Sequence, residues 1–276
     1  MDHDGYSCLR IHTEGGVATL TLDHPPINLL DLALIGELER AGRALEADPD
    51  VRVVVLESAD PEFFIAHADV DLILRLPAAE APRPSEPSFF QQMVERFRSM
   101  PKATIASIAG ICRGGGSELA LSCDMRFAAL GRAVLGQPEV AVGILPGGSG
   151  SQRLPRLCGR GRALEIILGC EDFPAELAER YGWVNRALPP DELGPFVQRL
   201  AARIASFPAE AIAHAKAAVI AGERPWREGL VEEAHLFNRC LAIPESRARM
   251  QGFLALGGQT RAVEARSPLA LDVKGG

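Results

Sequence analysis

The chain has 276 residues, of which 47% are hydrophobic and 24% charged, and its formal net charge is −7. These proportions are typical of a folded globular protein, and the length suits one large domain or a domain with an appendage. The acidic balance disfavours partners rich in phosphate, so we expect no binding to nucleic acid or to an anionic membrane.

The first part of the chain alternates between strand and helix patterns. Residues 8–26 predict a hairpin of two alternating strands that a Gly-Gly turn joins and two prolines end. Residues 29–50 have apolar side chains at helical spacing, and residues 51–60 form a β-branched run typical of a strand buried on both faces. The order β-β-α-β predicts a mixed or parallel sheet that helices cover.

The later elements continue this alternation and then change in character. Residues 75–88 contain four prolines and no periodicity, which predicts a surface loop or lid. A helix over 89–100 and a strand over 103–110 follow, and a glycine cluster then leads into another helix. The last part is alanine-rich and helical, so we expect an α/β core over 1–199 and a helical appendage over 200–276. Such an appendage serves oligomerisation or packs on its own core.

The six cysteines include no Cys-x-x-Cys pair and no Cys/His spacing that suits zinc. In a chain of this size they are expected to be reduced thiols of a cytoplasmic protein. The first ten residues lack the apolar segment of a signal peptide, and no run of about 18 apolar residues predicts a span. We therefore expect a cytoplasmic protein without a metal ion or a membrane segment.

One histidine stands in an otherwise apolar segment. His67 lies in FFIAHADVDL, between two alanines and two residues before Asp69. Most histidines in such positions are satisfied core or loop residues. The segment by itself therefore assigns His67 no function.

Three consecutive glycines, Gly114 to Gly116, stand between a strand and a helix that we expect to begin near Ser117. Glycine lets a ligand approach the backbone, and a helix start offers unpaired N–H groups and a partial positive charge. Such a turn suits a developing oxyanion, although tight turns also need glycine for steric reasons alone. Glu118 follows in the first helical turn, where the macrodipole by itself favours a carboxylate.

A second carboxylate, Glu139, follows Pro138 and precedes an apolar run and the turn Pro146-Gly147-Gly148. A glutamate after proline is commonly a solvated turn residue. A glutamate tied to a glycine-rich turn could instead be aimed at a site by rigid backbone. Taken singly, Glu118 and Glu139 each allow a structural and a functional interpretation.

In combination, these segments resemble the crotonase, or enoyl-CoA hydratase/isomerase, superfamily. The resemblance extends from the hairpin at Leu9 to the helical tail and is strongest in AGICRGGGSELALSCDMRFAA, LGQPEVAVGILPGGSGSQRL and FPAELAERYGWVNRALP. It implies a crotonase-like α/β fold of ββα repeats around a mixed sheet, with a helical C-terminal appendage. It also implies a homotrimer or a dimer of trimers.

The resemblance further implies the residues of an acyl-thioester site. The backbone N–H groups of Ala68 and Gly115 would hold the thioester oxygen, Glu118 would activate a water, and Glu139 would manage the proton at Cα. The positions that would bind substrate or support the site are Ala66, His67, Asp69, Gly114, Gly116, Pro138 and Gly147. The substrate would be a 2-enoyl-CoA thioester, so coenzyme A would enter as part of the substrate, with no separate cofactor.

Several positions depart from the family pattern. His67 replaces a usual glycine before the first oxyanion donor, so the loop is expected to differ slightly in shape. Asp71 stands where a lysine that reaches the CoA phosphates is common, and Leu256 stands where many members have lysine. An aspartate there would repel phosphate. The cations that could compensate are Arg75, Arg113 and Lys216; a shorter or carrier-bound thioester is the alternative.

Three functions stay open at this point. A hydratase uses both glutamates, whereas a double-bond isomerase needs one well-placed carboxylate to shuttle a proton. A non-catalytic or carrier-bound acyl-thioester binder is favoured by His67 and by the replaced lysines, and disfavoured by the intact pair of glutamates. Hydrolases and decarboxylases also occur on this scaffold, so the fold alone does not decide the reaction.

Overall fold

The structure, a computed structural model, describes residues 5–76 and 84–255 of the chain. The chain forms two compact units, residues 1–205 and residues 206–276. The last helix of the first unit is α8 (Pro190–Ala205), and the boundary expected from the sequence, at 199–200, falls inside it.

Within the described residues, ten strands form two sheets in the first unit. In the six-stranded sheet, of order β1-β2-β3-β5-β7-β10, β1 pairs antiparallel with β2 and the other neighbours are parallel. In the four-stranded sheet, of order β4-β6-β8-β9, the pairs β4–β6 and β6–β8 are parallel and β8–β9 is antiparallel. The strands are β1 (Leu9–Glu14), β2 (Val17–Leu22), β3 (Val53–Ser58), β4 (Phe63–Ile65), β5 (Ala103–Ile108), β6 (Ile111–Arg113), β7 (Met125–Ala129), β8 (Val134–Gly136), β9 (Phe173–Pro174) and β10 (Arg186–Leu188).

The order of elements repeats a β-β-α unit. In the units that begin at β3, β5 and β7, the first strand joins the six-stranded sheet, the second joins the four-stranded sheet, and one or two helices follow. The predicted mixed sheet built from ββα repeats is therefore confirmed. The helices of this unit besides α8 are α1 (Leu32–Ala47), α2 (Val70–Leu74), α3 (Phe89–Ser99), α4 (Gly115–Ser122), α5 (Gly150–Cys158), α6 (Arg160–Gly169) and α7 (Ala175–Tyr181), with a 3-10 helix, η1 (Glu139–Val142).

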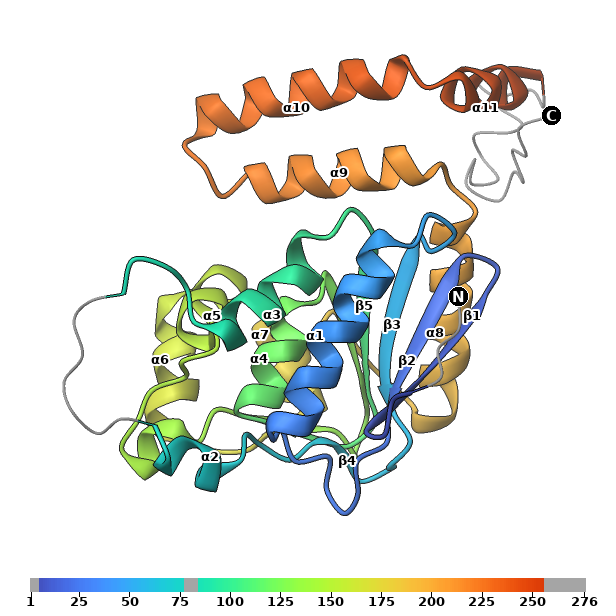
Figure 1. Ribbon diagram of the computed structural model, residues 1–276. Coiled ribbons are helices and arrows are strands. Elements are labelled where there is room, and N and C mark those ends of the chain that lie inside the picture. The colour runs from blue at the N-terminus through green and yellow to red at the C-terminus, as the bar shows by residue number, and fades with distance from the viewer. Residues whose placement is uncertain (1–4, 77–83, 256–276) are drawn as a thin grey trace. The chain divides into compact units, whose positions relative to one another are not determined.

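The core lies where the continuous apolar runs of the sequence predicted it. All six residues of β5 and the first four of β3 are buried, as central parallel strands covered on both faces require. Helix α8 packs against β2, β3, β5 and β7, and α3 contacts both α1 and α4 (Figure 1). Every residue of α4 is buried, so this short helix is held from all sides.

Two local elements differ from the sequence-based expectation. The helix expected near Ser117 begins two residues earlier, at Gly115, because Gly114 makes the turn with φ +50° and the next two glycines are already helical. The segment around His67 leaves β4 and enters the short helix α2, which the sequence did not indicate. Half of the predicted loop over 75–88, residues 77–83, lies outside the described residues.

The second unit is helical throughout its described part, apart from short connections. It consists of α9 (Ala209–Ala221), α10 (Trp226–Leu241) and α11 (Pro244–Ala255), in which α10 contacts both other helices. None of the helices in the described ranges is by itself long and apolar enough to cross a membrane; α8 and α9 reach that length and composition only when taken together.

Candidate active site

The predicted site segments meet because three parallel strands end side by side. In the four-stranded sheet, Ile65 of β4 pairs with Cys112 of β6, and Arg113 of β6 pairs with Gly136 of β8. The N–H of Gly114 also donates to the carbonyl of Gly136 at 3.0 Å. The segments that follow these strands, 66–69, 114–118 and 137–139, are therefore neighbours at one edge of the sheet.

The glycine turn leaves no room for side chains. A Cβ on Gly115 would lie 2.8 Å from Leu30 Cδ2, and a Cβ on Gly116 would lie 2.5 Å from Ile65 Cβ. The Cβ position of Gly115 is also 3.4 Å from Ala68 Cβ, so the two predicted oxyanion segments are in contact. Glycine is required here for close approach of the backbone as well as for the turn.

The backbone N–H groups of Ala68 and Gly115, which lie at this contact, have no acceptor among the described residues. Leu30 N–H donates to His67 O at 3.0 Å, and Asp69 N–H donates to Leu30 O at 3.1 Å. Because the amide plane fixes C=O and N–H in opposite directions, the N–H of Ala68 points away from Leu30. Gly115 is the first residue of α4, so its N–H has no intrahelical partner. These two N–H groups, on segments in contact with each other, are thus available to a ligand.

Glu118 lies in the first turn of α4 and is only 3% exposed. Its Oε1 accepts from the N–H of Gly148 at 2.7 Å and from that of Gly150 at 2.8 Å. Burial raises the pKa of Glu118, while these two N–H bonds and the charge of Arg153 act in the opposite direction. Its Oε2 accepts no hydrogen bond from the described residues, which leaves this oxygen available for proton transfer.

Glu139 is the first residue of η1 and is half-buried. Its Oε1 lies 3.3 Å from the Cβ position of Gly114, so the carboxylate is beside the glycine turn. Burial raises the pKa of Glu139 to about 7, and the nearby charge of Glu118 raises it as well. A carboxyl group with this pKa holds a proton in part of the molecules at neutral pH.

Two polar residues that the sequence reasoning did not select orient this carboxylate. Gln137 is fully buried, and with its amide nitrogen turned toward Glu139 it donates to Oε2 at 3.0 Å and to Oε1 at 2.9 Å. In the same orientation its oxygen accepts from Ser117 Oγ at 3.2 Å. Both side chains are polar and stand next to the candidate residues, and that position was the signal that could have found them.

Three glycines after η1, Gly147, Gly148 and Gly150, form the loop beside Glu118, and each makes a different backbone hydrogen bond. The two N–H donors come from Gly148 and Gly150, which the sequence reasoning did not select. The predicted supporting residue Gly147 contributes its carbonyl, which accepts from Gln91 Nε2 at 2.9 Å. A Cβ on Gly148 would meet the Phe90 ring at 2.1 Å and Glu118 Oε2 at 2.5 Å, so only glycine fits there.

His67 lies at the site, and its ring bonds back to the backbone. Its Nδ1 is 2.8 Å from the carbonyl oxygen of Ala68, and its Cβ is 3.7 Å from the Cβ position of Gly114. A carbonyl only accepts, so Nδ1 is the donor of this bond. His67 is not among the residues with positive φ, so the backbone takes a conformation that any residue adopts.

The other predicted positions have structural roles that fit the site. Ala66 is buried and its N–H donates to Ile27 O at 3.2 Å. Asp69 caps α2 by accepting from the N–H of Asp71 at 2.9 Å. Pro138 precedes η1 and is its N-cap.

The three cations that could replace the missing lysines, Arg75, Arg113 and Lys216, differ in their contacts and in their place in the fold. Arg113 forms a two-pronged ion pair with Asp172, at 2.6 Å from Nε to Oδ1 and 2.5 Å from Nη2 to Oδ2. It is therefore committed within the protein, whereas Arg75 is exposed after α2. Lys216 belongs to the second unit, and Leu256 lies outside the described residues.

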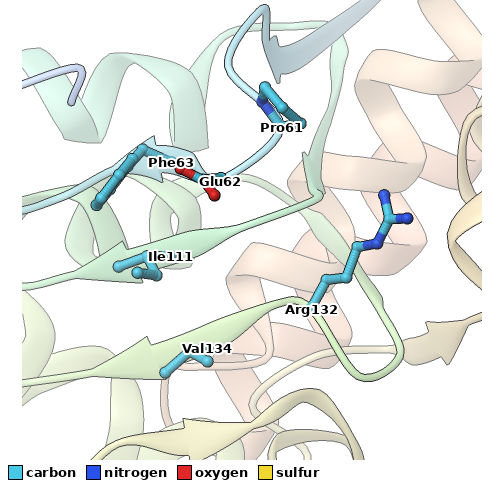
Figure 2. A pocket seen from close by; sticks show the side chains of 6 residues that line it. All are labelled: Pro61, Glu62, Phe63, Ile111, Arg132 and Val134. Carbon is cyan, nitrogen blue, oxygen red and sulfur yellow. The ribbon is translucent and has the colours of Figure 1, made fainter. Parts of the chain in front are cut away.

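One cavity of about 550 Å³ lies at a different place (Figure 2). Its lining residues stand at or just before the starts of β4, β6 and β8, whereas the candidate site lies at the ends of these strands. They are Pro61, Glu62, Phe63, Ile111, Arg132 and Val134. No predicted site residue lines this cavity. Among the described residues, no group of three or more His, Cys, Asp or Glu side chains is arranged to hold a metal ion.

The fold and the site define a class of protein: a crotonase-fold protein with a glycine turn and two carboxylates beside it. The family model described as enoyl-CoA hydratase/isomerase matches residues 12–257, and the chain belongs to this family. A protein named crotonyl-CoA hydratase, from Syntrophomonas wolfei, is 34% identical over 251 residues, which cover 90% of this chain and 95% of that protein. A short-chain-enoyl-CoA hydratase from Clostridium acetobutylicum is 31% identical over 246 residues, covering 88% and 93%.

Solved structures are similar over the same length. The enoyl-CoA hydratase of Bacillus anthracis superposes with a TM-score of 0.82 at 30% identity, covering 90% of this chain and 96% of that one. A putative enoyl-CoA hydratase from Streptomyces avermitilis is 40% identical, with a TM-score of 0.72 and coverage of 96% and 98%. The crotonase fold inferred from the sequence is thereby confirmed.

Proposed function

We propose that this chain hydrates 2-enoyl-CoA thioesters or dehydrates the corresponding 3-hydroxy forms. The observation that carries the proposal is the convergence of Glu118 and Glu139 on the glycine turn that also presents the N–H of Gly115. The relatives named as hydratases of crotonyl-CoA and of short-chain enoyl-CoA support the choice of reaction.

The oxyanion donors activate the substrate. When the N–H groups of Ala68 and Gly115 bind the thioester oxygen, the conjugated double bond becomes electron-poor at Cβ. Each donor of this kind contributes on the order of 3–4 kcal/mol to transition-state stabilisation in other enzymes. Because both donors belong to tightly packed backbone, they need no rearrangement when the negative charge develops.

The two carboxylates move the protons. Glu118 Oε2 takes a proton from a water molecule as its oxygen bonds to Cβ, and the π electrons move toward the thioester oxygen to give an enolate. The enolate then takes a proton at Cα from Glu139 and restores the thioester C=O. The pair therefore begins with one proton, on Glu139, and ends with one proton, on Glu118. The raised pKa of Glu139 suits the first of these states.

We also propose that no cofactor is needed besides the coenzyme A of the substrate, since the chain itself supplies the oxyanion donors and both proton carriers.

A homotrimer or dimer of trimers is supported by apolar side chains that the second unit exposes, including Val219, Trp226, Val231 and Phe237. A cytoplasmic location is supported by the six cysteines, all of which are free thiols.

The test is incubation of the purified protein with crotonyl-CoA while the absorbance of the conjugated thioester is followed. We expect this absorbance to fall and the product to gain the mass of one water. A 3-enoyl-CoA in parallel distinguishes an isomerase, which would shift its double bond without any gain of mass. No reaction, together with no measurable binding of crotonyl-CoA, would contradict the proposal and favour a carrier-bound substrate.

We expect the His67→Gly variant to keep measurable hydration. The bond from Leu30 N–H to His67 O is made by the backbone and survives, so the orientation of the Ala68 N–H is kept. The lost bond from Nδ1 to Ala68 O is one hydrogen bond, worth about 0.5–1.5 kcal/mol net. A fall in kcat/KM of less than about tenfold is the expected result. Complete loss of activity with an unchanged circular dichroism spectrum would show that His67 takes part in the reaction.

A further inference from the structure

The start of helix α3 presents two phenylalanines in different environments. Phe89 is 58% exposed, whereas Phe90 is half-buried. The Phe90 ring lies against the candidate site: its Cζ is 3.5 Å from the Cβ position of Gly115. Its Cε1 is 2.1 Å from the Cβ position of Gly148. The ring thus reaches from the oxyanion turn to the loop that holds Glu118.

The same ring is a neighbour of the reactive carboxylate oxygen. Glu118 Oε2 lies 2.5 Å from the Cβ position of Gly148, the point that the Phe90 ring also approaches. This oxygen has no hydrogen-bond partner among the described residues and is the one assigned to the attacking water. An apolar ring therefore stands beside the oxygen of Glu118 that is open to a ligand.

The position of the ring is fixed by the helix that carries it. Ser88 and Gln91 form a capping box, in which Ser88 Oγ accepts from Gln91 N–H at 3.2 Å and Gln91 Oε1 accepts from Ser88 N–H at 2.8 Å. Gln91 Nε2 also donates to Gly147 O at 2.9 Å. One side chain therefore ties the start of α3 to the loop that holds Glu118, and these bonds fix the backbone from which the Phe90 ring projects.

We propose that Phe90 closes the acyl pocket just beyond Cβ and restricts the enzyme to short, unbranched 2-enoyl thioesters. The inference rests on the proposed hydration, since it places Cβ between the oxyanion donors and Glu118. From there, a chain longer than the crotonyl group runs against the phenyl ring. Phe90 is a specificity-determining residue in this scheme, with no part in the proton transfers.

The test compares 2-enoyl-CoAs of four and ten carbons on the wild type, Phe90→Ala and Phe90→Leu. Phe89→Ala is the matched control, because it removes an exposed ring of the same type from the same helical turn. The wild type should prefer the four-carbon substrate. Each newly buried CH₂ strengthens binding roughly fourfold, so Phe90→Ala should raise the ten-to-four-carbon ratio of kcat/KM at least about tenfold. Phe90→Leu should be intermediate and Phe89→Ala unchanged.

A second measurement keeps this inference separate from the proposed function. Binding of saturated butanoyl-CoA and decanoyl-CoA, measured by calorimetry, needs no turnover. The Phe90→Ala variant should gain affinity for decanoyl-CoA relative to butanoyl-CoA even if the wild type hydrates nothing. An unchanged ratio in folded Phe90→Ala and Phe90→Leu, or a wild type that already prefers ten carbons in both measurements, would overturn the role of Phe90.

Discussion

The Glu139→Gln variant is expected to lose turnover of crotonyl-CoA by a factor of about 10²–10⁴, because a positioned acid or base contributes an acceleration of this order. Glutamine has nearly the same shape but cannot give a proton to Cα. Glu139 is half-buried at the start of η1, so the exchange should leave the fold intact. The measurement is kcat with saturating substrate, together with the melting temperature.

The pH dependence of kcat/KM gives a second test of the role of Glu139. The reacting form of the pair carries one proton, whichever glutamate holds it, so both directions of the reaction need the same protonation state. With the pKa of Glu139 raised to about 7, kcat/KM should fall as the pH rises through this range, equally for hydration and dehydration. In Glu139→Gln the residual activity should lack this alkaline limb.

An exposed carboxylate in helix α8 supplies the control for this prediction. Glu192→Gln removes the same charge from the surface and should keep the wild-type rate and pH profile. A Glu139→Gln variant with near-wild-type turnover, or with its alkaline limb unchanged, would exclude Glu139 as the proton donor to Cα.

The Glu118→Gln variant is expected to lose a similar factor of about 10²–10⁴ in turnover, because the attacking water no longer has a base. The side-chain oxygen of glutamine can still accept from the N–H groups of Gly148 and Gly150, so the loop around them should keep its structure. Binding of butanoyl-CoA should therefore change little while kcat falls. The measurement is kcat beside the dissociation constant.

A comparison with Glu118→Ala separates chemistry from structure at this position. Alanine leaves two buried N–H groups without an acceptor, and each unsatisfied group costs about 1–3 kcal/mol. We expect Glu118→Ala to be less stable than Glu118→Gln and equally inactive. A Glu118→Gln variant that unfolds like Glu118→Ala would show that the charge of this carboxylate holds the loop; one that turns over normally would exclude Glu118 as the base.

Much of the fold was readable because local patterns and global architecture agree. The hairpin, the buried run that became β3 and the fully buried β5 follow from alternation and from continuous β-branched segments. The start of α4 was misplaced by two residues, because a glycine run is compatible with turn and with helix until the φ of Gly114 is known. The short strands of the second sheet carry too few residues to show a period.

In the candidate site, too, some residues were found from the sequence and others only from the structure. Glu118, Glu139 and the glycine turn could be selected from the sequence because of the family resemblance, whereas each of them alone also allowed a structural interpretation. His67 is marked too, but only its distance to Ala68 O shows that its ring bonds to the backbone. The sequence does not show that Gln137 contacts both Glu139 and Ser117, since these contacts depend on the turn from β8 into η1 and on the position of α4 beside it.

The sequence by itself determined the ββα order, the family resemblance and the chemical groups of the site, because these depend on residue type and spacing along the chain. Only the tertiary structure decided which N–H groups hold Glu118, that Arg113 is paired with Asp172, and that the Phe90 ring lies beside Gly115 and Gly148. These contacts join segments more than twenty residues apart. Their geometry is set by the parallel pairing of β4, β6 and β8 and by the docking of α3, which no local pattern specifies.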